Sequence, residues 1–105
     1  MLHIHDVMLD AIVTMRPVVR AIERHDRDLA SQLKRAASSV VLNVSEGSGS
    51  AGGVRLQRYR TALGSARETW SCLRVAQAAG YVEGLPAALE ALMNRVIGTL
   101  VRVAT

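Results

Sequence analysis

The stretch LQRYRTALGSARETWSCLRVAQ, residues 56–77, decides the fold class of this chain. Seven positions in it recur at alternating spacings of three and four residues, which is the heptad spacing of a helix with one packed face. They are Leu56, Tyr59, Leu63, Ala66, Trp70, Leu73 and Gln77. Gly80 follows this stripe and is expected to stop the helix. The stretch therefore predicts a long amphipathic helix packed against other helices.

The first part of the chain repeats the same spacing. Its stripe consists of Ile4, Met8, Ala11, Met15, Val18 and Ile22. Pro17 lies inside this segment, and an interior proline costs a helix about 3 kcal/mol. We therefore expect a helix that is kinked or broken near Pro17. The polar run 23–28 is the expected turn, with Asp26 or Asp28 as the N-cap of the next helix.

The second predicted helix carries a polar residue on its apolar stripe. That stripe consists of Leu29, Leu33, Ala36, Val40, Asn43 and Gly47. Gly47 and Gly49 are expected to end this helix, because glycine tolerates the left-handed conformation of a C-cap. Ser50 or Gly53 then begins the helix that contains residues 56–77.

The last segment completes a set of four helices. Pro86 suits a first helical turn, and the stripe consists of Leu85, Leu89, Leu92, Val96, Leu100 and Val103. Phe is absent and half of the residues are hydrophobic, which favours an aliphatic, helix-on-helix core. Short connections make consecutive helices antiparallel neighbours. We therefore predict one all-α domain, residues 1–105, folded as an antiparallel up-down-up-down four-helix bundle.

Several classes of function are not expected from the composition. Cys72 is the only cysteine, so an internal disulfide is impossible and a reducing compartment is favoured. The N-terminal residues lack a basic signal-peptide region, and no apolar run approaches about 18 residues. We therefore expect a cytoplasmic protein without a membrane partner. His3 and His5 are two residues apart and cannot share a helix face, so neither a metal nor another cofactor is predicted.

The region around Asn43 and Glu46 is the first candidate site. The following glycine- and serine-rich segment lacks the GK[ST] ending of a phosphate-binding loop and no strand precedes it, so we interpret it as a connection. We predict that Asn43 hydrogen-bonds across the bundle, as a buried Asn does in coiled coils. Glu46 and Glu68 are expected to pair with Arg on neighbouring helices or subunits. A hydrolase that uses both carboxylates is a disfavoured alternative, and no enzymatic activity is predicted.

The second candidate site is the set of arginines. All thirteen basic residues except Lys34 are Arg, and the net charge is +4. Arg60, Arg67 and Arg74 repeat every seven residues, and Arg55 and Arg58 lie nearby. Arg16, Arg20 and Arg24 repeat every four residues in the first helix. Such rows can follow a phosphate backbone, whereas the alternative is a solvated face or arginines at a subunit interface.

Two segments, QLKRAASSVVLNVSEGSGS and YRTALGSARETWSCLRVAQAAGYV, resemble a bacterial family. Its members are small four-helix-bundle proteins encoded in intervening sequences of large-subunit rRNA genes. The family also includes the accessory variability determinant of diversity-generating retroelements. The shared residues are Gln32, Arg35, Ala36, Ser39, Asn43, Glu46, Gly47, Ala62, Gly64, Ser65 and Glu68.

The resemblance implies a homo-oligomer, with a pentamer known in the family, and a basic surface that binds RNA or DNA. In the retroelement branch it also implies partnership with a reverse transcriptase. Arg35, Asn43, Glu46, Gly47 and Glu68 become signature residues of the bundle and its assembly. The leading hypothesis is therefore a non-enzymatic nucleic-acid-binding accessory protein. The alternative is a protein-interaction module whose Arg residues lie at interfaces.

Overall fold

The computed structural model describes residues 3–105, and within this range it contains five α-helices and no strand. The helices are α1 (Ile4–Thr14), α2 (Arg16–Glu23), α3 (Arg27–Ser48), α4 (Gly52–Ala78) and α5 (Ala87–Val103). The all-α class is confirmed, but the structure has five helices where the sequence predicted four. Across the described range, none of the helices combines the length and apolar character that a bilayer crossing requires.

The extra helix arises from a break at Met15, two residues before Pro17. Pro17 has no N–H to donate, and its ring crowds the carbonyl four residues earlier. It is therefore accommodated in the first turn of a new helix, α2. The backbone N–H of Met15 still bonds the Ala11 carbonyl at 2.9 Å. All six predicted stripe residues of this segment are buried, so the break leaves the apolar stripe facing the core.

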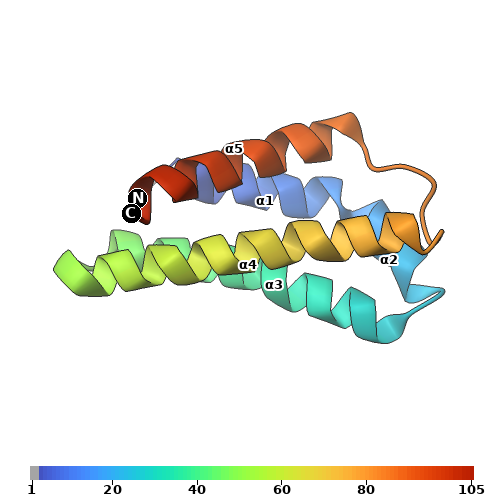
Figure 1. Ribbon diagram of the computed structural model, residues 1–105, viewed down its shortest axis with the longest axis horizontal. Helices are drawn as coiled ribbons and strands as arrows, with labels where there is room; N and C mark the ends of the chain where they lie inside the picture. Colours follow the sequence, from blue (N-terminus) through green and yellow to red (C-terminus); the bar gives the residue numbers. More distant parts are fainter. Residues whose placement is uncertain (1–2) are drawn as a thin grey trace.

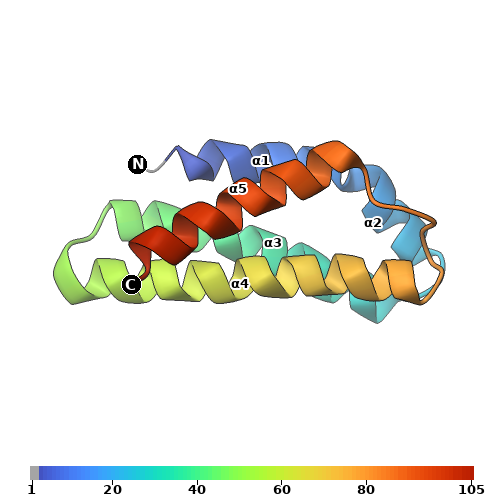
Figure 2. The same cartoon turned by 45° about the horizontal axis from the view of Figure 1, so that its top comes forward.

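The two longest helices, α3 and α4, lie side by side along most of the molecule (Figure 1). They run in opposite directions, because Glu46 contacts Arg58 at one end of the pair and Ser39 contacts Ser65 further along. The α5 helix crosses obliquely and packs against both α1 and α4 (Figure 2). The α2 helix packs on α3. The whole measures 43 × 24 × 19 Å.

The buried face of α4 differs from the predicted heptad stripe. Its buried residues are Tyr59, Ala62, Ala66, Thr69, Cys72, Leu73 and Ala76. Leu63 and Trp70 are only partly buried, and Gln77 is exposed. Tyr59, Ala66 and Leu73 of the predicted stripe are buried as expected. The other buried positions are the smaller residues Ala62, Thr69, Cys72 and Ala76.

The connection between α3 and α4 also differs from the prediction. Gly49 is the C-cap of α3, but its φ of −87° is not left-handed. The α4 helix begins at Gly52, with Ala51 as N-cap. Gly52 has a φ of +59°, so the left-handed residue belongs to the start of α4. At the other end, Gly80 follows α4 with a φ of +80°, as a helix stop requires.

Asp26 caps α3, and Asp28, the other predicted cap, lies within the first turn. The Asp26 carboxylate accepts a hydrogen bond from the Leu29 N–H at 2.9 Å. We expect Asp26→Ala to lower the free energy of unfolding by about 1 kcal/mol, because an N–H of the first turn loses its acceptor. Urea unfolding followed by circular dichroism measures this change. Asp28→Ala is the control, and an equal loss in both variants would contradict the assignment.

Candidate nucleic-acid interface

Arg60, Arg67 and Arg74 all lie on α4 with exposed side chains, but they differ in what they contact. The Nε of Arg60 donates a hydrogen bond to the Ala104 carbonyl at 3.2 Å and thereby ties α4 to the end of α5. Within residues 3–105, Arg67 and Arg74 have no carboxylate within 4.0 Å. Arg74 borders a cavity of about 180 Å³ together with Trp70 and Glu90. Arg67 and Arg74 are therefore the cations of this row that remain available to a ligand.

Arg55 and Arg58 are engaged with α3 and its C-terminal connection. The Nε of Arg55 donates to the Ser50 carbonyl at 2.9 Å and to the Gly47 carbonyl at 3.2 Å. It thus satisfies backbone acceptors where α3 ends. The Nε of Arg58 lies 3.1 Å from Oε2 of Glu46. This ion pair confirms the predicted pairing of Glu46 with an Arg of a neighbouring helix.

Arg16 and Arg20 lie on α2, and Arg24 is its C-cap residue. All three side chains are exposed. Arg16 also borders a groove of about 240 Å³ that is lined by Ile12, Met15 and Val19 on one side and by Lys34 on the other. The predicted first-helix row therefore lies at the surface, next to α3.

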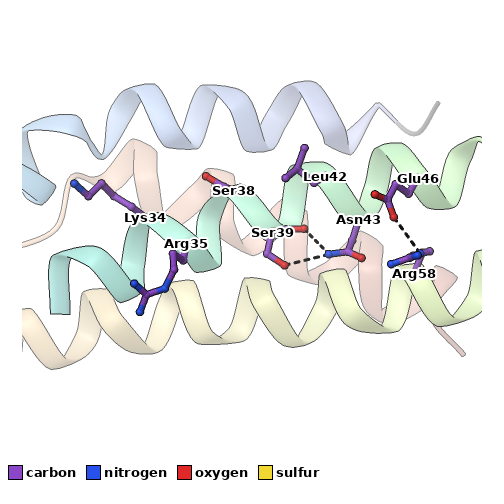
Figure 3. Close-up of a pocket in the computed structure, with 8 residues that line it drawn as sticks. All are labelled: Lys34, Arg35, Ser38, Ser39, Leu42, Asn43, Glu46 and Arg58. Atoms are coloured by element: carbon purple, nitrogen blue, oxygen red, sulfur yellow. Dashed lines mark hydrogen bonds and ion pairs between the residues drawn. The ribbon is translucent and has the colours of Figure 1, made fainter. Parts of the chain in front are cut away.

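The exposed side of α3 forms a larger groove of about 470 Å³. Its lining residues, shown in Figure 3, are Lys34, Arg35, Ser38, Ser39, Leu42, Asn43, Glu46 and Arg58. All except Arg58 belong to α3, and Arg58 reaches in from α4. Three of the signature residues, Arg35, Asn43 and Glu46, thus meet in one groove. This groove was not predicted from the sequence, although the spacings of eight residues from Arg35 to Asn43 and three from Asn43 to Glu46 indicate a shared helix face.

The predicted hydrogen bond from Asn43 across the helices is wrong. Its amide Nδ2 donates within α3, to the Ser39 carbonyl at 2.9 Å and to Ser39 Oγ at 3.1 Å. The cross-helix bond is made by Ser39 itself, whose Oγ lies 2.7 Å from Oγ of Ser65 on α4. The buried stripe of α3 passes through Val44. Asn43 therefore stands one position away from that stripe, at the groove surface, and orients Ser39.

Gly47 permits the closest contact between α3 and α4. A Cβ atom at this position would lie 2.6 Å from Cε1 and 2.7 Å from Cδ1 of Tyr59. Tyr59 is 7% exposed, and its hydroxyl lies 3.2 Å from Oγ of Ser48. Gly47 was predicted to help end the helix, whereas it lies inside α3 as a buried packing residue.

Glu68 and Glu46 do not form a paired carboxylate site. Glu46 is bound to Arg58, and Glu68 does not line the groove on α3. Among residues 3–105, Glu68 has no Lys, Arg or His within 4.0 Å. Burial, and secondarily the charge of Glu68, raises the pKa of the Cys72 thiol. No group of three or more His, Cys, Asp or Glu side chains in the same range could hold a metal ion.

The described surface carries more basic side chains than form ion pairs. Every Lys and Arg side chain is exposed. Of these thirteen residues, only Lys34 and Arg58 form ion pairs within residues 3–105, at 3.8 Å to Glu23 and 3.1 Å to Glu46. Excess unpaired arginine at a surface is the electrostatic pattern that suits polyanions.

The helical fold and these side chains define a small all-α protein with many exposed arginines. Residues 7–101 match the model of the 23S rRNA-intervening sequence protein family. The chain belongs to that family, as the resemblance in its second and third predicted helices indicated. The structure is also similar to that of a protein of unknown function from the S23 ribosomal protein family of Bacteroides thetaiotaomicron. That match has a TM-score of 0.79 at 16% identity and covers 97% of this chain and 98% of the other. No curated protein shows a significant sequence match.

Proposed function

We propose that this protein is a non-enzymatic, homo-oligomeric accessory protein that binds the phosphate backbone of RNA or DNA through exposed arginines. The observation that supports it best is the set of exposed cations, of which only Lys34 and Arg58 have an acidic partner in the described chain. Each cation that neutralises a phosphate releases counterions and thereby increases affinity. Trp70 and Tyr81 are partly buried and Tyr59 is buried, so base stacking contributes little and sequence preference is low.

In this proposal the subunit is an up-down-up-down four-helix bundle, in which α1 and α2 together form the first, interrupted helix. The resemblance to the accessory proteins of diversity-generating retroelements supports a homopentamer and a reverse transcriptase as partner. Membership in the rRNA intervening-sequence family supports a role linked to rRNA. These two settings share the same requirement, a compact subunit that presents arginine to nucleic acid.

A protein-interaction module is the second candidate function. Arg55, Arg58 and Arg60 are bound to groups of the chain itself. Leu9, Val13 and Leu42 are large apolar side chains exposed on α1 and α3, with Leu42 at 61% exposure. Exposed apolar side chains that gather on one face are typical of surfaces that bind another protein. In this candidate function the arginines surround an interface and do not contact nucleic acid.

We expect the triple variant Arg60→Gln, Arg67→Gln, Arg74→Gln to weaken binding of labelled RNA and duplex DNA and to flatten the salt dependence. Each lost phosphate contact reduces the slope of log affinity against log salt by about 0.7 for a single strand and about 0.9 for a duplex. Fluorescence anisotropy across a salt series measures both quantities.

The matched control is Arg95→Gln with Arg102→Gln, which removes exposed charge from α5. Light scattering of the same samples reports oligomeric mass. Unchanged binding in the triple variant would exclude this row as the contact surface. A change in mass with unchanged affinity would favour the interaction module, and absence of wild-type binding at about 50 mM salt, where phosphate contacts are strong, would exclude nucleic acid altogether.

A further inference from the structure

The groove on α3 combines two rows of residues from one helix with a single side chain from the next. Lys34, Ser38, Leu42 and Glu46 are spaced four apart, and Arg35, Ser39 and Asn43 form a second row beside them. Residues four apart stack along one helix face. The groove therefore runs along the axis of α3, and Arg58 from α4 lies at the end next to Glu46 (Figure 3).

Positive charge lies at both ends of this groove. Lys34 and Arg35 stand at one end, and Arg58 stands beside Glu46 at the other. Eleven residues of helix separate Arg35 from Glu46, a rise of about 16 Å. A single phosphate group cannot span that distance. An extended polyanion with several phosphates can reach both ends at once.

The cations at the first end are available. Arg35 has no carboxylate within 4.0 Å among residues 3–105. The Nζ of Lys34 is 3.8 Å from Glu23, and about half of each side chain is exposed. Such an exposed ion pair contributes little free energy, so a phosphate can displace Glu23 at small cost.

The centre of the groove is uncharged. Ser38, Ser39, Asn43 and the exposed Leu42 lie between the charged ends, and none of the described lining residues is aromatic. A strand in this groove can be held through its backbone but not by base stacking. Glu46 is the only anion of the lining, and it both orients Arg58 and repels a phosphate placed there.

We infer that the α3 groove binds the sugar-phosphate backbone of a single nucleic-acid strand, with Lys34 and Arg35 on separate phosphates at one end and Arg58 on a phosphate at the other. This inference rests on the proposed function and adds a second contact surface to Arg67 and Arg74 of α4. In this inference Glu46 lowers the affinity for nucleic acid, because its negative charge repels a phosphate at the Arg58 end of the groove.

The test compares Lys34→Gln with Arg35→Gln in one protein against Arg95→Gln with Arg102→Gln in another. The probe is a fluorescein-labelled single-stranded oligoribonucleotide, and the readout is anisotropy across a salt series. We expect the groove variant to bind about tenfold more weakly near 0.1 M salt and to lose about 1.4 from the salt slope, since two contacts are removed. The control pair should change both quantities much less.

The substitution Glu46→Gln is expected to change the binding affinity in the opposite direction. Loss of its charge should tighten oligoribonucleotide binding severalfold, because Arg58 then faces the phosphate without a competing carboxylate. Inorganic phosphate should compete poorly in all variants, since it occupies only one end. Weaker binding by Glu46→Gln would overturn the inference, as would a groove variant that matches the control pair. If the wild-type protein binds no nucleic acid, the proposed function itself is wrong. If the wild-type protein binds and the groove variant binds equally well, only the groove is excluded as a contact surface.

Discussion

Gly47→Ala should lower the free energy of unfolding by about 2–3 kcal/mol, the upper part of the range for overpacking in a tight core. The new methyl group would lie 2.6 Å from Cε1 of Tyr59 and 3.2 Å from Cβ of Arg58. The Tyr59 ring is buried and cannot rotate freely away. Relief therefore requires α3 and α4 to separate at their shared end, where Glu46, Arg58 and Arg55 also interact. Urea unfolding at a fixed protein concentration measures the change.

Gly64→Ala is the matched control for this substitution. Gly64 lies inside α4 and is exposed, and a Cβ atom there would have no contact within 4 Å among residues 3–105. Alanine there should stabilise the protein by about 0.5–1 kcal/mol through helix propensity. Adding Tyr59→Leu to Gly47→Ala should recover part of the loss, because it removes the ring atoms that clash. Equal stability of wild type and Gly47→Ala would show that Gly47 is not a packing residue.

The contrast between the first segment and α4 explains how much of the fold the sequence could predict. In the first segment every stripe position is a large aliphatic residue or Ala11, and all six positions are buried. The period alone was sufficient there, and Pro17 marked the break. In α4 the same period selected Leu63, Trp70 and Gln77, which are partly or fully exposed. The buried residues of α4 that the period missed include Ala62, Cys72 and Ala76, whose small size carries no periodic hydrophobic signal of comparable strength.

In the candidate site too, the sequence pattern predicts which residues lie together but not which atoms they contact. The spacing of Arg35, Asn43 and Glu46 places them on one helix face, so their meeting in the groove could be expected. The direction of each hydrogen bond could not, because Asn43 bonds within α3 while Ser39 crosses to α4. Likewise, the repeat of arginines in α4 could not reveal that Arg60 is hydrogen-bonded to the Ala104 carbonyl while Arg67 has no ion-pair partner within residues 3–105. That distinction depends on the path of α5.

The second large effect is expected in the core, where Leu73→Ala should cost about 3 kcal/mol. Leu73 is fully buried and belongs to the hydrophobic core that α4 shares with the other helices. Truncation removes apolar contacts and leaves a cavity, and the close-packed surroundings collapse only in part. For a domain of this size the loss corresponds to a fall in Tm of about 12–24 °C. Thermal and urea unfolding followed by circular dichroism provide the measurement.

Val75→Ala is the control that separates the loss of a core contact from a general effect of shortening a side chain on α4. Val75 is two residues from Leu73 on the same helix but is 51% exposed. Its replacement by alanine should leave stability within about 0.5 kcal/mol of wild type, since little burial is lost and helix propensity improves. Similar losses in both variants would mean that residue 75 is covered in solution, as it would be at a subunit interface. Repeating the measurement over a range of protein concentrations would then reveal that interface, because association makes apparent stability depend on concentration.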